Sequence, residues 1–225
     1  MTDGTAGDAN DRVGDAADGD DPDVETLIME ATYRALRTHG YADLSVAHIA
    51  EEFEKSKSLL YYHYDSKDDL LAGFLEFAGD RFLTMLAEAE RDADDPVGTL
   101  RALVDIYLAA EVDEEMAEAQ RAIIDLRAQA VSEPRFREEF TRIDRTLRSR
   151  LVSAVADGVD AGTFPADLDP ETAGSAVLSM LTGAMLQRHT ADAEAVSPVR
   201  STIHGYLDDL VTDDTDAGDD ADADA

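Results

Sequence analysis

An apolar stripe with the spacing of an α-helix runs through residues 136–158 of this chain. Its members are Phe136, Phe140, Ile143, Leu147, Leu151, Ala154 and Gly158, which follow one another in steps of four and three. Residues three and four apart lie on one face of an α-helix, so the pattern predicts one long helix with a single buried face. Pro134 stands where a helix tolerates proline, in its first turn.

Similar patterns recur along most of the chain, each preceded by a helix start signal. Asp–Pro pairs stand at 21–22, 95–96 and 169–170, and Ser45, Ser56 and Ser66 are N-cap candidates. These signals predict helices at 23–39, after 45, after 56, from 66, from 96, at 114–131, from 134, from 170 and at 198–212. With no cysteine and few β-branched runs, the composition predicts an all-α fold.

Acidic residues dominate the charge of the chain. Asp and Glu number 51 against 19 Lys and Arg, which gives a formal net charge of -32. One interpretation is a surface adapted to very high salt, because the Debye length falls to about 3 Å in molar salt; the other is local cation binding. The acids are spread over the whole chain, which favours the salt-adapted surface.

The two ends of the chain are predicted to be disordered acidic tails, at residues 1–21 and 212–225, because Asp with Gly and Ala supplies nothing to pack. The first residues carry no secretory signal, and no apolar run reaches the roughly 18 residues that a membrane helix needs. We therefore expect a cytoplasmic protein with no membrane partner.

All three lysines lie within one stretch, KSKSLLYYHYDSK at residues 55–67. Residues 53–56 separate the two short predicted helices on either side, which is the spacing of a helix-turn-helix whose second helix enters the DNA major groove. No acid occurs from Ser56 to Tyr64. An acid-free face in so acidic a chain indicates a surface that meets an anion.

Residues 40–41, 44–50, 56–64 and 66–71 resemble the TetR family of repressors, and the resemblance is specific over about residues 23–71. It implies a dimeric DNA-binding regulator that a ligand releases. By position, it implies a DNA surface of Ser45, Ser56, Lys57, Ser58, Leu59, Tyr61, Tyr62, His63 and Lys67. The turn departs from the family pattern, since Glu54 and Lys55 replace a Gly and an apolar residue.

Ser45 and Lys67, at helix N-termini, would hold phosphates, and Leu59 would meet a thymine methyl group. Each role has a structural alternative. Lys67 is otherwise a solvated surface lysine, Leu59 is tucked into the bundle, and part of the Tyr61 ring belongs to the core.

The resemblance divides the chain into a three-helix DNA-binding domain at 22–68 and a helical effector-binding and dimerisation bundle at 69–211. Met and aromatic residues suit an adaptable apolar pocket, and the candidates for it are Phe82, Met85, Tyr107, Met116, Ile123, Phe140, Ile143 and Met180. Dimerisation is expected through 133–161 and 170–188, although the stripe at 136–158 can instead serve the core of one subunit.

The alternative function is an all-α ligand-binding protein or enzyme in which the helix-turn-helix is only scaffold. The histidines lack metal-ligand spacing, and no phosphate-binding, dinucleotide or nucleophile motif occurs. We therefore expect no enzymatic activity, metal or cofactor.

Overall fold

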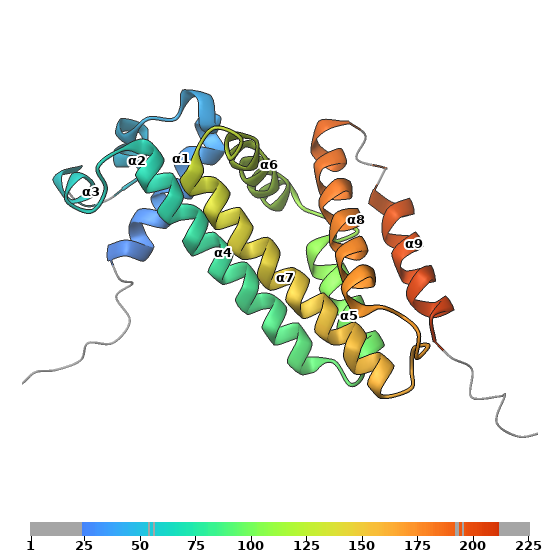
Figure 1. Ribbon diagram of the computed structural model, residues 1–225. Coiled ribbons are helices and arrows are strands. Elements are labelled where there is room, and N and C mark those ends of the chain that lie inside the picture. The colour runs from blue at the N-terminus through green and yellow to red at the C-terminus, as the bar shows by residue number, and fades with distance from the viewer. Residues whose placement is uncertain (1–23, 54, 56, 192–193, 195, 212–225) are drawn as a thin grey trace, which may run out of the picture.

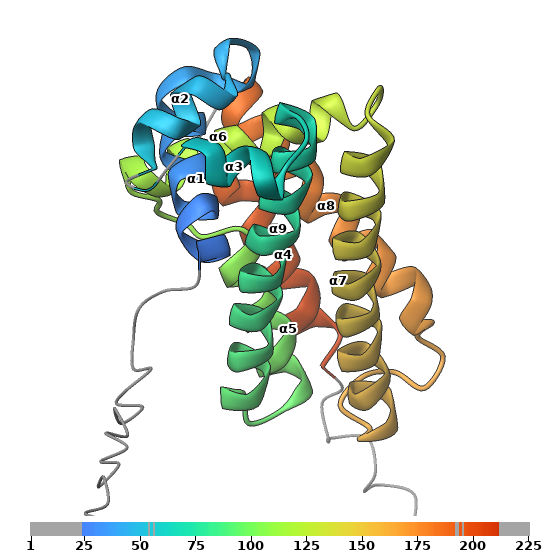
Figure 2. The same ribbon diagram turned by 90° about the vertical axis from the view of Figure 1, so that its left-hand side faces the viewer.

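The computed structural model describes residues 24–53, 55, 57–191, 194 and 196–211, and every regular element in these ranges is a helix (Figures 1 and 2). The helices are α1 (Val24–Asp43), α2 (Val46–Glu52), α3 (Lys57–His63), α4 (Lys67–Asp92), α5 (Pro96–Tyr107), α6 (Glu114–Gln129), α7 (Pro134–Asp160), α8 (Pro170–Thr190) and α9 (Val196–Asp209). The all-α prediction is confirmed. The two predicted tails, together with Glu54 and Ser56, lie outside the described residues.

The predicted start signals begin four of these helices. The Ser45 Oγ accepts from the His48 backbone N–H at 3.2 Å, and the Ser66 Oγ accepts from Asp69 N–H at 3.0 Å. Asp95 and Asp169 cap α5 and α8 in the same way, each followed by proline at the first helical position. These contacts satisfy N–H groups that have no partner within the helix.

Gly40 interrupts α1, which was expected to end at His39. Its φ of 66° is in the left-handed region that glycine adopts without strain. The helix resumes after Gly40 and ends at Asp43. The end that was expected at His39 is therefore a kink, and a further short helical segment follows it.

The buried side chains form two clusters. The first joins α1–α3 to the beginning of α4, to α6 and to the beginning of α7, and includes Ile28, Leu36, Ile49, Leu60, Leu70, Leu71 and Phe136. The second joins the end of α4 to α5, α7, α8 and α9 and includes Leu86, Leu103, Leu147, Leu151, Leu181 and Ile203. Helices α4 and α7 contribute to both clusters and run side by side through the molecule (Figures 1 and 2).

The stripe on α7 is buried within the subunit. Phe136 and Phe140 lie in the first cluster, and Leu147, Leu151 and Ala154 lie in the second. Gly158 is also buried, and a Cβ at this position would overlap the Phe164 ring. The stripe therefore serves the core of one subunit, which is the alternative that the sequence left open, and the expected dimer interface stays a prediction.

Candidate DNA-binding surface

Helix α3 is anchored to the protein chiefly by one residue. Leu60 is 0% exposed and is the single buried residue of this seven-residue helix. Leu59 is half-buried and packs against the first cluster, which favours the reading in which it is tucked into the bundle. Lys57, Ser58, Tyr61, Tyr62 and His63 are all exposed, so the helix presents a continuous basic and aromatic face.

Tyr61 differs from the expectation that part of its ring belongs to the core. The residue is 54% exposed, and the Lys57 ammonium lies 5.9 Å from its ring centroid. Tyr62 is 83% exposed, and its ring meets His63 edge-on at 5.3 Å. Successive residues of an α-helix are turned by about 100°, so Tyr61 and Tyr62 point away from the face that Leu60 buries.

Lys67 is neither buried in the core nor fully solvated. Its Nζ donates to the Tyr41 carbonyl at 3.0 Å and lies 4.4 Å from the centroid of the Tyr41 ring. An ammonium has three donors and a strong attraction to an aromatic face. The contact therefore places the charge at the start of α4 and still leaves N–H groups for another acceptor.

Ser45 occupies the corresponding place at the start of α2. Its hydroxyl oxygen accepts from the His48 N–H, so its own O–H remains able to donate. Lys55 is exposed in the turn between α2 and α3, and the remaining predicted residue, Ser56, lies outside the described ranges.

Three carboxylates near this surface have partners of their own. Glu52 pairs with Arg34 at 3.2 Å, and Asp68 accepts from the Tyr41 hydroxyl at 3.5 Å. Asp69 pairs with Arg135 of α7, and this hydrogen bond, with a second from the Asp65 backbone N–H, lowers the pKa of Asp69. These contacts offset part of the negative charge that would repel an anion from α3.

Two family models match this chain, one over its N-terminal helices and one over its C-terminal helices. The model of bacterial regulatory proteins of the tetR family matches residues 28–73. The model of the BetI-type transcriptional repressor C-terminal domain matches residues 96–212. The chain belongs to the TetR family.

Individual relatives agree with this family membership. A TetR transcription regulator from Haloarcula marismortui is 35% identical, with a TM-score of 0.76 over 84% of this chain and 98% of that one. The HTH-type transcriptional repressor AcnR of Corynebacterium glutamicum is 24% identical over 85% of this chain and 96% of its own length. A transcriptional regulator from Saccharomonospora viridis, solved in complex with choline, shares the fold with a TM-score of 0.70 and 18% identity over 84% and 97% of the two chains. The protein is therefore a DNA-binding transcriptional regulator.

Sequence reasoning gave Tyr41 and Tyr64 no role in this TetR-family domain. Tyr41 supplies both contacts to Lys67. Tyr64 follows α3 and is packed against Gly73, where a Cβ would lie 3.0 Å from its ring. Burial, and then the carboxylates of Glu25, Asp69 and Glu76, raise the pKa of Tyr64 to about 12. Tyr64 lies within the lysine-bearing stretch at 55–67, whereas Tyr41 precedes that stretch by 14 residues, so a sequence signal existed for Tyr64 alone.

His39 and His48 also come together, with ring centroids 3.9 Å apart and planes inclined by 14°. The His48 Nδ1 is buried and has no hydrogen-bond partner among the described residues. No group of three or more His, Cys, Asp or Glu within the described residues has the arrangement of a metal site. The same residues include no helix that is both long and apolar enough to span a bilayer.

The eight residues expected to line an effector pocket are spread over both apolar clusters and the surface. Ile123 and Phe140 belong to the first cluster, whereas Phe82, Tyr107 and Met180 pack on the second. Ile143 is half-buried beside Gly79. Met85 and Met116 are 42% and 48% exposed and lie at the surface of the subunit.

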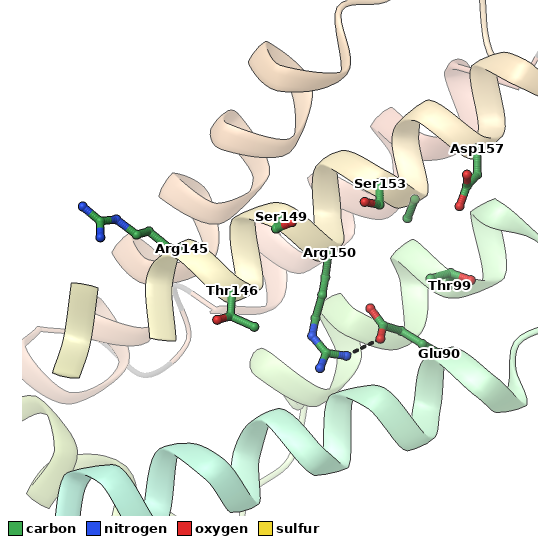
Figure 3. A pocket seen from close by; sticks show the side chains of 9 residues that line it. Glu90, Thr99, Arg145, Thr146, Ser149, Arg150, Ser153 and Asp157 are labelled. Carbon is green, nitrogen blue, oxygen red and sulfur yellow. Dashed lines mark hydrogen bonds and ion pairs between the residues drawn. The ribbon is translucent and has the colours of Figure 1, made fainter. Parts of the chain in front are cut away.

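A groove of about 630 Å³ lies instead along α7, between the end of α4 and the start of α5 (Figure 3). Its lining includes the polar side chains of Thr99, Thr146, Ser149 and Ser153 and the Arg150–Glu90 ion pair. A second hollow of about 270 Å³ lies around Tyr64 and Arg135, with five carboxylates in its lining. Neither contains any of the eight expected residues.

Proposed function

We propose that this TetR-family regulator is a cytoplasmic homodimeric repressor that leaves its operator when a small molecule binds the C-terminal domain. The observation that carries the DNA-binding part is the exposed, acid-free face of α3 in a chain of net charge -32. Family membership supports the remaining parts, because the C-terminal match is to a repressor domain.

In this proposal α3 enters the major groove, where base edges carry a distinct pattern of donors and acceptors. Lys57, Ser58 and Tyr62 are exposed and face base edges, while Lys67 and Ser45 position the domain on phosphates. Molar salt removes most of the counterion-release contribution to DNA affinity. Direct hydrogen bonds and apolar contacts at α3 then carry a larger share of the binding free energy.

Alanine variants of the three lysines test this assignment. Lys67→Ala should weaken binding to all DNA sequences about equally and flatten the salt dependence by about one unit. Lys57→Ala should lose about 1–3 kcal/mol of discrimination at one base pair. Lys55→Ala is the matched control, because Lys55 is also exposed but lies in the turn.

The measurement is the affinity for operator and for random DNA across KCl concentrations. A thermal unfolding curve of each variant separates lost contacts to DNA from lost structure, which matters for Lys67 because of its contacts to Tyr41. If all three variants bind both DNAs like the parent, the lysines do not mark the DNA-binding surface.

The dimer interface is proposed at the outer face of α8 and α9. Between Glu171 and Arg188 helix α8 has no charged residue. Its exposed positions there include Ala176, Ser179, Gly183 and Leu186. On α9, Gly205 and Tyr206 are exposed. Two copies that each carry -32 repel one another, so an uncharged face of small residues is where they can approach.

Leu186→Asp should convert the dimer to a monomer, because it puts a buried charge at the interface and none inside the subunit. Val131→Asp is the matched control, since Val131 is also an exposed apolar residue but lies outside α8 and α9. Size-exclusion chromatography with light scattering in molar KCl gives the mass of each. A monomeric parent chain, or a dimeric Leu186→Asp variant, would contradict this interface.

A further inference from the structure

Arg188, in the last turn of α8, is the most buried charged side chain described, with 8% of its surface exposed. Its Nη1 donates to the Gln120 Oε1 of α6 at 3.2 Å, and its Nη2 donates to the carbonyl of Ala109 in the α5–α6 loop. Both acceptors are neutral. The guanidinium therefore joins three segments of the C-terminal domain without a counter-charge from either contact.

Other arginines that are partly removed from water differ from Arg188 in having carboxylate partners. The half-buried arginines among the described residues all pair with carboxylates, and they are Arg37, Arg127, Arg142, Arg150 and Arg200. For Arg188 no carboxylate among the described residues lies within ion-pair distance, and burial lowers its pKa. A buried charge with no partner costs several kcal/mol.

An acidic residue does lie close to this place in the sequence. Glu111 lies two residues beyond Ala109, whose carbonyl Arg188 contacts, and it is exposed to solvent. A purely structural arginine at this place would gain from pairing with it. The protein instead holds the guanidinium with a backbone carbonyl and an amide, which fix its position and leave its charge uncompensated.

A histidine and a second arginine lie near Arg188. The His189 Nε2 lies 2.9 Å from the same Gln120 Oε1. Because that oxygen has no proton to donate, the imidazole must donate to it, which places a proton on Nε2. Burial, and then the charges of Arg188 and Arg121, lower the pKa of His189. Arg121 is exposed and has no carboxylate partner among the described residues.

We infer that the small-molecule effector is an anion and that its carboxylate binds the guanidinium of Arg188. A guanidinium has five N–H donors in a planar fork that matches a carboxylate, and contacts to the described residues use two of them. The ligand supplies the counter-charge that the fold withholds. This inference rests on the proposed function, since it names the chemical class of the effector.

The position of the site offers a route to the DNA-binding domain. Gln120 lies on α6, and the same helix carries Glu115 and Glu118, which pair with Arg37 of α1 at 3.2 and 2.5 Å. The Tyr33 hydroxyl of α1 also reaches the Glu115 carbonyl, at 3.5 Å. An anion that draws Arg188 away from Gln120 alters the contacts of α6, and α6 is packed against α1. A ligand acts in this way only if it binds the two arrangements unequally.

The test compares matched potassium salts and uncharged ligands at constant total potassium: acetate, hexanoate and benzoate, against hexanamide and benzamide, with choline as the cation. Thermal unfolding is followed for the parent chain, Arg188→Met, Arg188→Gln and the control Arg148→Gln. Arg148 is exposed and has no carboxylate partner among the described residues. Carboxylates should raise the unfolding midpoint of the parent and of Arg148→Gln, with saturation, and should leave both Arg188 variants unchanged.

Without ligand, Arg188→Met should be no less stable than the parent, because it removes a buried charge that lacks a counter-charge. Lower stability would show that Arg188 only joins α8 to the α5–α6 loop and would overturn the inference. Stabilisation by choline or the amides in place of the carboxylates, equal stabilisation of the Arg188 variants, or no stabilisation by any carboxylate would overturn it as well.

Operator affinity measured on the same samples separates the two proposals. The stabilising carboxylate should weaken operator binding by the parent roughly 5- to 150-fold, the range of ordinary allosteric couplings, and leave operator binding by Arg188→Met unchanged. Unaltered operator affinity despite stabilisation through Arg188 would overturn the effector role. A parent chain that binds no operator in the absence of ligand would instead overturn the proposed repressor function.

Discussion

Leu60→Ala should abolish specific operator binding and lower the free energy of unfolding by about 2–5 kcal/mol. Leu60 is the one fully buried side chain of α3, and it is completely inaccessible to water. A seven-residue helix is not stable in water without packing. The variant therefore loses the orientation of the recognition helix as well as the contacts of one leucine.

Two neighbouring substitutions make this prediction specific. Tyr62→Ala should leave stability within about 0.5 kcal/mol, because the residue is exposed, and should reduce DNA affinity alone. Leu59→Ala distinguishes the two readings of that half-buried residue. A tucked side chain gives a loss of stability, and a base contact gives a loss of affinity at unchanged stability. Denaturant unfolding and DNA titrations in molar KCl measure both quantities, and operator binding by Leu60→Ala at the parent affinity would contradict the account of α3.

The helices could be predicted from the sequence because their signals are local. Ser45, Ser66, Asp95 and Asp169 each accept from a backbone N–H three residues ahead, so sequence distance and spatial distance agree. Seven residues are too few to display a complete stripe, so the sequence leaves open whether part of the Tyr61 ring, next to Leu60, belongs to the core; the residue is 54% exposed.

The arrangement of the C-terminal domain depends on contacts that no local pattern encodes. Arg37 meets Glu115 from 78 residues away, and Arg188 meets Gln120 from 68 residues away. Methionine is a residue type that is common in cores, but Met85 and Met116 lie on outward faces of their helices. Burial of an arginine is also contrary to the usual distribution of that residue. Helix packing decides whether an apolar side chain lies in the first cluster, in the second cluster or at the surface. The sequence pattern does not determine that packing.

Gly174→Ala should lower the free energy of unfolding by about 1–3 kcal/mol, even though alanine is the better helix former by about 1 kcal/mol. A Cβ at this position would lie 2.7 Å from the Val152 Cγ2, 2.9 Å from its backbone N and 3.1 Å from its Cα. A side chain can rotate away from such an overlap, whereas the backbone of α7 cannot. Relief of the overlap thus requires α8 to separate from α7, and these two helices form much of the second cluster.

Gly183, further along α8, provides the matched comparison. A Cβ there meets no neighbouring atom of the described residues within 4 Å, so Gly183→Ala should raise stability by up to about 1 kcal/mol through helix propensity alone. Gly183→Leu extends the comparison to the partner. Because the described residues leave space around this position, we expect the cost of the leucine to come from a second copy at the α8–α9 face, where overpacking should cost about 1–3 kcal/mol of dimer stability. Guanidinium unfolding at several protein concentrations separates the two terms, since only the dimer term depends on concentration. Equal destabilisation by Gly174→Ala and Gly183→Ala would contradict the close approach of α7 and α8, and an undisturbed dimer in Gly183→Leu would place the interface elsewhere.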